Sequence, residues 1–197
     1  MPKSSTTPQP LDDAALAQVT GGAATSGNDS LGGGTGNDYI NSISGNDSVR
    51  GGAGGDNIDG GFGNDLVMGN QGNDTLYGAA GNDIIIGGTG DDRIHGDQLF
   101  GEQGNDVIRW GPGQGNDTIN GGGGTDQIIL EGVNMTPQQL IAAITVTSGS
   151  QPSIQGPSVN LTGVTGYITI GNERISFSNI ESLVSGSYQW FSGRSET

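Results

Sequence analysis

The chain has no cysteine, a single histidine, few aromatic residues and only six Lys and Arg residues. Without cysteine, no disulfide can stabilise the fold and no thiolate can act as a nucleophile or metal ligand. Against those six basic residues stand 21 Asp and Glu, and the resulting net charge of −15 disfavours a nucleic-acid partner. No apolar run reaches the roughly 18 residues that a membrane-spanning helix needs, so no membrane span is expected.

Motifs of the common enzyme classes are also missing. The sequence contains no His-Glu-x-x-His, no Gly-x-Ser-x-Gly and no Walker-type phosphate loop. One histidine leaves few candidates for general acid–base catalysis. We therefore expect a protein that is not an enzyme and has no catalytic residues.

Glycine is the abundant residue, with 40 copies in 197 positions, while the hydrophobic fraction is only 30%. This composition alone would favour disorder, because glycine loses the most conformational freedom on folding and the carboxylates repel one another. The glycines, however, belong to a nine-residue repeat that spans residues 24–129 and occurs eleven times. Its sixth position is always Asp: Asp29, Asp38, Asp47, Asp56, Asp65, Asp74, Asp83, Asp92, Asp106, Asp117 and Asp126.

Each repeat divides into a turn and a short strand. Positions 1–6 are rich in Gly, Asn and Asp, which favour tight turns, and positions 7–9 form a strand with an aliphatic residue at position 8. Repeated turns and strands predict a solenoid in which two repeats make one coil, coils lie about 4.8 Å apart, and the eighth residues meet inside. These expected core residues are Leu31, Ile40, Val49, Ile58, Val67, Leu76, Ile85, Ile94, Ile108, Ile119 and Ile128.

The stacked turns bring backbone carbonyls and Asp oxygens together, and this set of ligands favours Ca²⁺, which binds six to eight oxygens in flexible geometry. Mg²⁺ demands a near-ideal octahedron, and Zn²⁺ prefers His or Cys. The alternative, a metal-free solenoid whose Asp residues only shape turns, leaves the stacked charge without compensation. We expect several bound Ca²⁺ ions, which would offset the negative charge.

These repeats resemble those of the repeats-in-toxin (RTX) family, whose Gly-Gly-x-Gly-x-Asp-x-U-x nonapeptides form a Ca²⁺-binding parallel β-roll. The resemblance implies an all-β fold, a right-handed parallel β-roll (β-solenoid), with Ca²⁺ between turns n and n+2. One implied row of ligands contains Asp29, Asp47, Asp65 and Asp83, and the other contains Asp38, Asp56, Asp74 and Asp92. These two rows contain six such pairs, and if the interrupted copies keep the alternation, Asp106, Asp117 and Asp126 extend them to nine. The resemblance thus implies about six to nine Ca²⁺ ions.

Several copies depart from the pattern. Ala24-Thr25 and Ser42-Ile43 replace the Gly-Gly pair, and Asn70, Ala79 and Glu102 stand at position 2. We expect strained or weak sites at these turns. Insertions at 96–100 and at Trp110-Gly111 break the period; the first should form a loop, and Leu99, Phe100 and Trp110 should cover an edge of the roll or contact the C-terminal part.

The regions on either side of the array differ from it. Residues 1–23 resemble a double-glycine leader that an ABC-type exporter cleaves after Gly22, the alternatives being a capping helix or a disordered tail. In residues 130–197, Thr136-Pro137-Gln138-Gln139 predicts a capped helix and residues 167–177 predict a hairpin. We expect this α+β segment to cap the roll. It also resembles the region after RTX repeats that carries a type I secretion signal, to which Trp190-Phe191 would belong.

Outward positions are mostly polar, with one exception. Leu66, Met68, Ile84 and Ile86 belong to neighbouring coils and should form an apolar patch, either covered by the C-terminal segment or used for association.

We therefore expect a secreted, extracellular, noncatalytic Ca²⁺-binding protein that folds on binding the ion and serves as a structural matrix, surface or filament component. The alternative is a polysaccharide-binding module similar to the β-roll modules of alginate epimerases.

Overall fold

The structure is a computed structural model that describes residues 24–98 and 102–186. The leader-like segment 1–23, the residues Leu99 and Phe100 of the first insertion, and Trp190-Phe191 in the tail lie outside the described residues.

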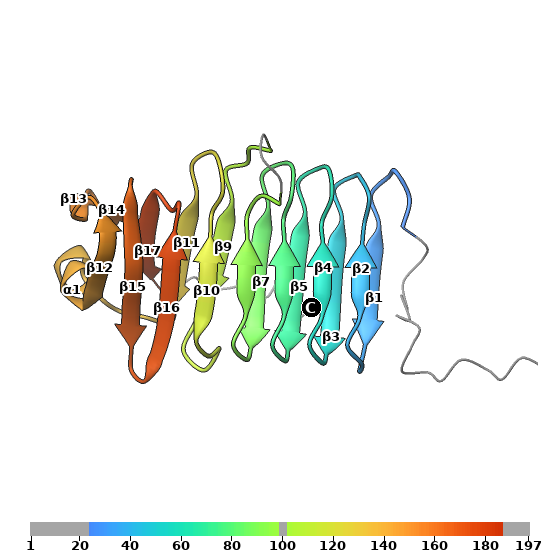
Figure 1. Cartoon of the computed structure of the whole chain (residues 1–197), viewed down its shortest axis with the longest axis horizontal. Coiled ribbons are helices and arrows are strands. Elements are labelled where there is room, and N and C mark those ends of the chain that lie inside the picture. Colours follow the sequence, from blue (N-terminus) through green and yellow to red (C-terminus); the bar gives the residue numbers. More distant parts are fainter. Residues whose placement is uncertain (1–23, 99–101, 187–197) are drawn as a thin grey trace, which may run out of the picture.

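The repeats wind into a roll of two parallel sheets, with successive strands alternating between them (Figure 1). One sheet contains β1 (Ser30–Gly34), β3 (Ser48–Ala53), β5 (Leu66–Gln71), β7 (Ile84–Thr89), β9 (Val107–Trp110) and β11 (Gln127–Glu131). The other contains β2 (Tyr39–Asn41), β4 (Asn57–Asp59), β6 (Thr75–Tyr77), β8 (Arg93–His95) and β10 (Asp117–Asn120). Pairing partners are one coil apart, as in Val49 with Val67, so the turns of alternate repeats stack directly.

The two sheets differ in strand length. Strands β2, β4, β6 and β8 are three residues long, as the repeat predicts, whereas β3, β5 and β7 are six residues long. The extra residues occupy positions 1–3 of the next repeat, where Asn70 pairs with Gly88 and Gln71 with Thr89. Stacked turns on this side therefore continue the sheet, because identical backbone conformations in neighbouring coils present matching donors and acceptors.

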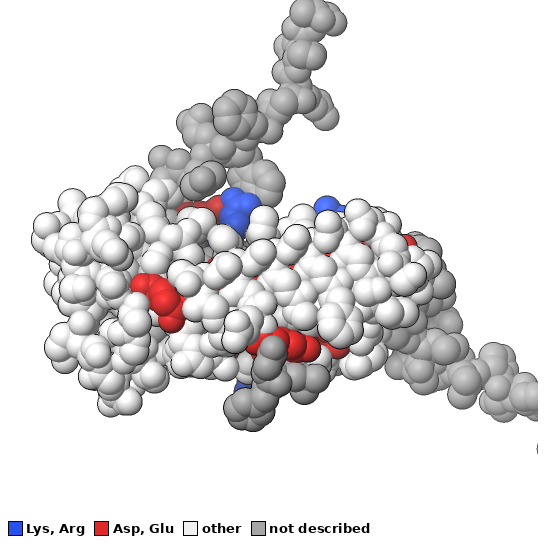
Figure 2. Space-filling model, turned by 90° about the horizontal axis from the view of Figure 1, so that it is seen from above, with Lys and Arg blue, Asp and Glu red and all other residues white. Residues whose placement is uncertain are grey.

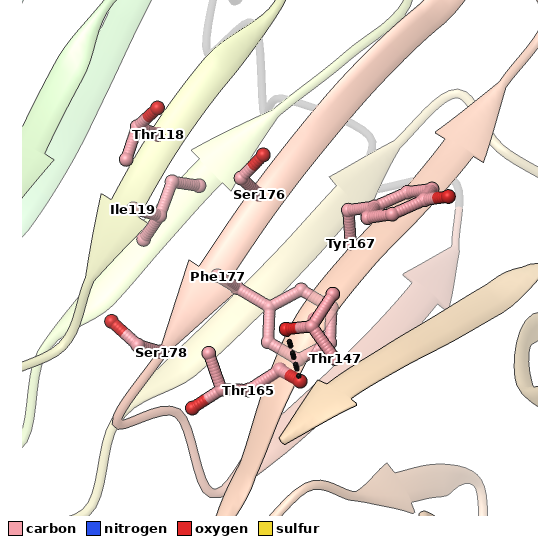
Figure 3. Close-up of a pocket in the computed structure, with 9 residues that line it drawn as sticks. Thr118, Ile119, Thr147, Thr165, Tyr167, Ser176, Phe177 and Ser178 are labelled. Carbon is pink, nitrogen blue, oxygen red and sulfur yellow. Dashed lines mark hydrogen bonds between the residues drawn. The ribbon is translucent and has the colours of Figure 1, made fainter.

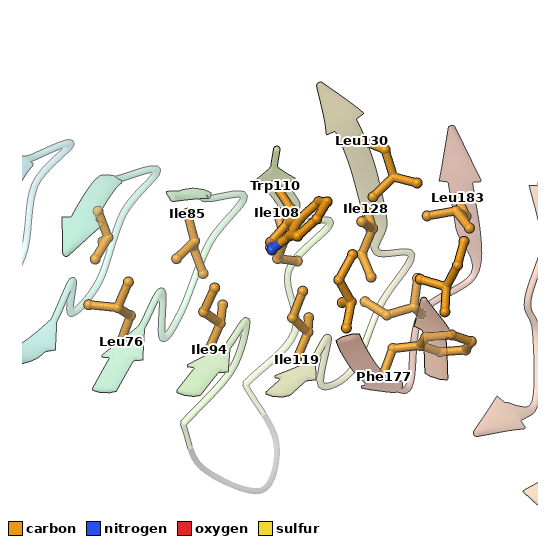
Figure 4. Packing of buried hydrophobic residues seen from close by; sticks show 14 of the residues in the cluster. Leu76, Ile85, Ile94, Ile108, Trp110, Ile119, Ile128, Leu130, Phe177 and Leu183 are labelled. Atoms are coloured by element: carbon orange, nitrogen blue, oxygen red, sulfur yellow. The ribbon is translucent and has the colours of Figure 1, made fainter. Parts of the chain in front are cut away.

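The core is a seam of aliphatic side chains between the sheets (Figure 4). All eleven residues at position 8 are at most 2% exposed, which confirms the sequence prediction. Trp110 and Leu130 extend this seam because they stand at position 1, where the earlier coils of the same sheet have glycine, as in Gly69 and Gly87. Trp110 is 1% exposed, so it lies in the core and does not cover an outer edge.

The C-terminal segment continues both sheets and closes the end of the roll. It consists of α1 (Pro137–Ala143), β12 (Ile144–Gly149), β13 (Ser153–Gln155), β14 (Ser158–Asn160), β15 (Val164–Ile170), β16 (Glu173–Ser178) and β17 (Ser182–Gly186). β17 pairs with β11, β16 pairs with β10, and the predicted hairpin is β15–β16. The predicted helix has its complete capping box between Thr136 and Gln139.

The outward apolar residues are adjacent, as predicted, because Leu66 pairs with Ile84 and Met68 with Ile86. Ile84 is 42% exposed. The described C-terminal strands extend the sheets beyond β11 and β10 and do not cross this face. Among the described residues, no helix is both long enough and apolar enough to cross a membrane.

The first insertion begins later than the sequence indicated. Gly96, which the repeat count places in the insertion, occupies position 1, because its N–H donates to Asn120 O and its own carbonyl accepts from Ala79 N–H. Asp97 follows in the place of position 2, and Glu102 belongs to the insertion. A repeat count alone cannot find this boundary, since Gly96 and Gly101 fit the pattern equally well.

Candidate cation sites

The eleven repeat Asp residues form two rows, and all are brought into register. Each Asp N–H donates to the Oδ1 atom of the Asp in the next coil at 2.7–2.9 Å, in nine pairs. The first row runs Asp29, Asp47, Asp65, Asp83, Asp106 and Asp126, and the second runs Asp38, Asp56, Asp74, Asp92 and Asp117. The alternation therefore survives both insertions.

The second carboxylate oxygen of these residues has no hydrogen-bond partner. The Oδ2 atoms of all repeat Asp residues except Asp29 are buried and unpartnered in the described part of the chain. Leaving a buried charged oxygen without a donor costs a large share of its hydration energy. Ten such atoms in two rows indicate that a cation completes the environment, because no described basic side chain reaches them.

The glycine at position 1 creates the space for that cation. A Cβ atom placed on Gly60 would lie 2.8 Å from Asp65 Oδ2 and 2.7 Å from the carbonyl oxygen of Gly78 in the next coil. At Gly78 the same point is 2.5 Å from Asp83 Oδ2 and 2.8 Å from Gly96 O. Carboxylate and carbonyl oxygens thus converge beside each glycine, and oxygen donors of these two kinds suit a hard cation such as Ca²⁺.

This convergence of Asp Oδ2 with a carbonyl of the next coil recurs at seven turns. The glycines concerned are Gly33, Gly51, Gly60, Gly69, Gly78, Gly96 and Gly121. Two other turns lack the glycine altogether, since Ala24 and Ser42 stand at position 1. The Ser42 hydroxyl donates to Gly60 O, so it occupies an oxygen that the cation would use.

The second row is also incomplete at its C-terminal end. At Gly87 the Asp92 carboxylate is present but no carbonyl of the next coil lies among the nearest atoms. In that next coil Trp110 replaces the glycine. The pair Asp92–Asp117 therefore lacks part of the arrangement seen in the earlier coils.

Three of the departures at position 2 are strained, as predicted for Ile43, Asn70 and Ala79, whereas Thr25 does not have a positive φ. Ile43, Asn70 and Ala79 have φ values of 74°, 77° and 73°, a region that favours glycine. The side chain at each of these positions thus raises the energy of a turn that the repeat normally builds with glycine. Glu102 was wrongly placed in this group, because the structure gives its expected position to Asp97.

Burial dominates the electrostatics of the rows. It raises the pKa of the interior carboxyls, and neighbouring carboxylates raise it further, while the N–H bonds from the preceding coil act in the opposite direction. The raised pKa values are about 6 for Asp65, Asp74 and Asp126, about 7 for Asp106 and Asp117, and about 8 for Asp83. Without a cation, the folded roll therefore disfavours its own ionised carboxylates near neutral pH.

The negative charge is largely hidden from the surface. On the face in Figure 2, neutral atoms cover most of the described roll and acidic atoms show only in small areas. Among the described residues, no three His, Cys, Asp or Glu side chains gather closely enough to hold one metal ion by themselves. The sites instead combine carboxylates with backbone carbonyls.

Sequence reasoning missed a second ladder formed by position 5. The Oδ1 atom of Asn46 accepts from Asn64 N–H, and Asn64 Oδ1 accepts from Asn82 N–H, both between neighbouring coils. In the sequence, the tolerance of Asn for turn conformations is enough to explain its presence at position 5. The available signal was that Asn occurs there more often than other turn residues, since its side-chain oxygen can accept the backbone N–H of the next coil.

Sequence reasoning also missed two glutamates of the C-terminal segment that accept backbone N–H groups at the end of the array. Glu181 Oε2 accepts from Asp126 N–H at 2.8 Å, and the Glu173 carboxylate accepts from Gly113 and Gly115 N–H at 2.8 and 2.9 Å. The signal for Glu181 is the aliphatic Leu183 two residues later, the same spacing that follows every repeat Asp.

These features define a class: a parallel β-roll whose stacked turns hold rows of buried carboxylates suited to cations. The family model described as the RTX calcium-binding nonapeptide repeat matches the chain at 23–58, 33–67, 41–76, 68–98, 94–109 and 113–134. These matches cover more than half of the sequence. The chain therefore belongs to the family of proteins with RTX calcium-binding repeats, and it is a Ca²⁺-binding β-roll protein.

No curated protein matches the chain. Among solved structures, it is similar to the extracellular lipase LipA from Serratia marcescens, with 18% identity and a TM-score of 0.27. The similarity covers 83% of this chain and 37% of the lipase chain, so this chain spans little more than a third of that protein.

Proposed function

We propose that this chain is a secreted, noncatalytic β-roll whose Asp rows hold Ca²⁺ and which serves as an extracellular structural component. The observation that carries the ligand assignment is the set of ten buried Oδ2 atoms without hydrogen-bond partners. Each proposed site takes carboxylates from two neighbouring coils and a backbone carbonyl beside a position-1 glycine.

The geometry ranks the nine pairs within the repeats. Six pairs have the glycine, the Asp oxygen and the carbonyl of the next coil: Asp38–Asp56, Asp56–Asp74, Asp74–Asp92, Asp65–Asp83, Asp83–Asp106 and Asp106–Asp126. Three are incomplete, namely Asp29–Asp47 at Ala24, Asp47–Asp65 at Ser42 and Asp92–Asp117 before Trp110. We expect the six complete pairs to bind Ca²⁺ more tightly than the other three.

Calcium binding is then coupled to folding. A chain with 40 glycines and a charge of −15 gains little from hydrophobic burial, so the binding free energy of the ions becomes folding free energy. In a compartment with little Ca²⁺ the chain stays unfolded and suited to passage through an ABC-type exporter, and it folds outside the cell.

Circular dichroism with and without a chelator tests this coupling. We expect a β-sheet signal in millimolar Ca²⁺ that is lost on chelation and restored by Ca²⁺ but not by the same concentration of Mg²⁺. Equilibrium dialysis in parallel gives the number of bound ions. A β signal that persists unchanged in the chelated protein contradicts coupled folding.

The structural role is supported by surfaces that a second copy can use. The patch formed by Leu66, Met68, Ile84 and Ile86 lies on the outer face of the sheet. β1 and β2 are the terminal strands of their sheets among the described residues, and such edges pair readily with other strands. Light scattering in Ca²⁺ over a range of protein concentrations should show assembly, whereas a protein that remains monomeric argues against this role.

The alternative function, polysaccharide binding, is favoured by a shallow groove of about 250 Å³ near the C-terminal end (Figure 3). Hydroxyl-bearing side chains line it, and Tyr167 stands at one side with Arg174 4.2 Å from its ring centre. Hydroxyl, aromatic and guanidinium groups are suited to sugar rings. Glycan-array binding that is lost in Tyr167→Ala, in a protein that stays monomeric, would favour this function over assembly.

A further inference from the structure

The turn that stacks on the last repeat reproduces the geometry of the repeats without their sequence. This turn consists of Asn179, Ile180 and Glu181, and it leads into β17 beside β11. Ser182 pairs with Gln127 and Leu183 with Ile128, so Glu181 takes the place that Asp holds in the other coils of the first row.

The backbone and side-chain contacts of Glu181 match that place. Asp126 N–H donates to Glu181 Oε2 at 2.8 Å, as each earlier Asp N–H donates to the carboxylate of the next coil. Glu181 N–H in turn donates to Asp126 O at 3.0 Å. A longer glutamate side chain thus substitutes for aspartate in a turn that is shorter than those of the repeats.

The space for an ion is also reproduced. A Cβ placed on Gly121 would lie 2.5 Å from Asp126 Oδ2 and even closer to the carbonyl oxygen of Asn179. Asp126 is 1% exposed, and its Oδ2 atom has no hydrogen-bond partner. Asn179 has a φ of 50°, so the turn holds a non-glycine residue in the left-handed region while its carbonyl faces this space.

The charges around this space are negative. Glu181 and Asp97 both face Asp126 and raise the pKa of its carboxyl, after burial itself. Asp97 is 9% exposed and its Oδ1 atom is buried without a partner. An unpartnered buried carboxylate oxygen and a carbonyl therefore converge beside Gly121, as they do at the complete pairs of the array, and the Glu181 carboxylate lies next to Asp126 through the bond from Asp126 N–H.

We propose that Asp126, Glu181 and the carbonyl of Asn179 form a further Ca²⁺ site, which joins the C-terminal segment to the roll. The site lies outside the nine Asp pairs, because two of its three contributors belong to the nonrepetitive segment. It makes the docking of β17 on β11 dependent on Ca²⁺. This inference rests on the proposed binding of Ca²⁺ by the Asp rows.

The test compares Glu181→Gln with Glu173→Gln in the full chain. Both residues accept backbone N–H groups at the C-terminal end of the array, but Glu173 accepts them from Gly113 and Gly115, whereas Glu181 accepts from the repeat residue Asp126. Equilibrium dialysis at saturating Ca²⁺ should show one ion fewer in Glu181→Gln and an unchanged number in Glu173→Gln. Hydrogen exchange of β17 should become faster only in Glu181→Gln, and its dependence on Ca²⁺ concentration should weaken.

A second check uses Asp126→Asn, which keeps a side chain of the same size. Because Asp126 also belongs to the pair Asp106–Asp126, this variant should bind two ions fewer than the wild-type protein. Wild-type protein that binds no Ca²⁺ overturns the proposed function as a whole. Wild-type protein that binds Ca²⁺, together with a Glu181→Gln variant that binds the same number of ions with the same affinity, overturns only the additional site.

Discussion

An Asp in the middle of a row should contribute far more to stability than an Asp at its end. Asp74 lies between Asp56 and Asp92, so Asp74→Ala affects two ion sites, both complete. Asp29 is the first residue of its row and takes part in one pair, at a turn with Ala24 at position 1. The two substitutions remove the same chemical group from different contexts.

The magnitude follows from three contributions. Asp74→Ala leaves the buried Asp56 N–H without its acceptor, which costs about 1–3 kcal/mol. At a free Ca²⁺ concentration about 100 times the dissociation constant, each lost ion costs about 2.7 kcal/mol, so two cost roughly 5 kcal/mol. The sum approaches the whole stability of many domains, about 5–15 kcal/mol. For Asp29→Ala, one ion at most is lost, about 3 kcal/mol, since among the described residues its carboxylate accepts from Thr25 and not from the N–H of another repeat Asp.

Urea unfolding followed by circular dichroism at several Ca²⁺ concentrations measures both effects. The cost of Asp74→Ala should grow with Ca²⁺ concentration, with about twice the slope found for Asp29→Ala, because two sites are linked to folding instead of one. Equal losses at the two positions, or losses that do not change with Ca²⁺, would refute the idea that interior carboxylates serve two sites each.

Three further predictions concern the glycines, the strained turns and pH. Gly78→Ala should lower the number of bound ions and destabilise the Ca²⁺-loaded protein by several kcal/mol, because its Cβ would lie 2.5 Å from Asp83 Oδ2 and 2.8 Å from Gly96 O. Gly36→Ala is the matched control in calorimetric melting, since no atom lies within 4 Å of a Cβ there, and it should change stability little. Ala79→Gly should raise the melting temperature, by an amount equivalent to about 1 kcal/mol, because Ala79 has a φ of 73°; a lower melting temperature would contradict strain at this turn. Burial raises the pKa of Asp83 from 3.8 to about 8 in the metal-free fold, so the folded state binds more protons than the unfolded chain between these values. The contribution of Asp83 to the stability of the metal-free fold is thus fully present below pH 3.8 and is lost as the pH rises toward about 8. Ca²⁺ affinity increases over the same range, because Ca²⁺ binds the ionised carboxylate. Circular dichroism of the metal-free protein and Ca²⁺ titrations, each at pH 5 and pH 8, should show these opposite trends.

The sequence predicts the roll well because every repeat has the same pattern. Position 8 is apolar and lies inside, and position 6 is Asp and stacks on the Asp of the neighbouring coil. All eleven repeats are therefore consistent with one solenoid of two repeats per coil. The helix from Pro137 and the hairpin near Tyr167 were predictable for a different reason, since a capping box and alternating apolar residues are local signals.

What the sequence did not show depends on contacts between residues far apart in the chain. Glu181 is separated from Asp126 by β11, the helix α1 and the five strands β12–β16, and no repeat period connects the two residues. Trp110 looked like part of an insertion because it breaks the period, whereas the structure uses it as the first large core residue at position 1. In both cases the local sequence fits more than one arrangement, and the neighbouring coil decides between them.

The hydrogen bonds between the Asp residues have a direction, and this direction explains why the nonrepetitive segment stands at the C-terminal end. In each row the N–H of an Asp donates to the carboxylate of the coil nearer the C-terminus. At that end, the N–H of Asp126 is a donor beside a buried carboxylate, and it needs an acceptor from outside the repeats, which Glu181 provides. At the other end Asp29 presents a half-buried carboxylate, which Thr25 and water can satisfy. The repeat thus requires a built acceptor only at its C-terminal end, where β16 and β17 continue the two sheets.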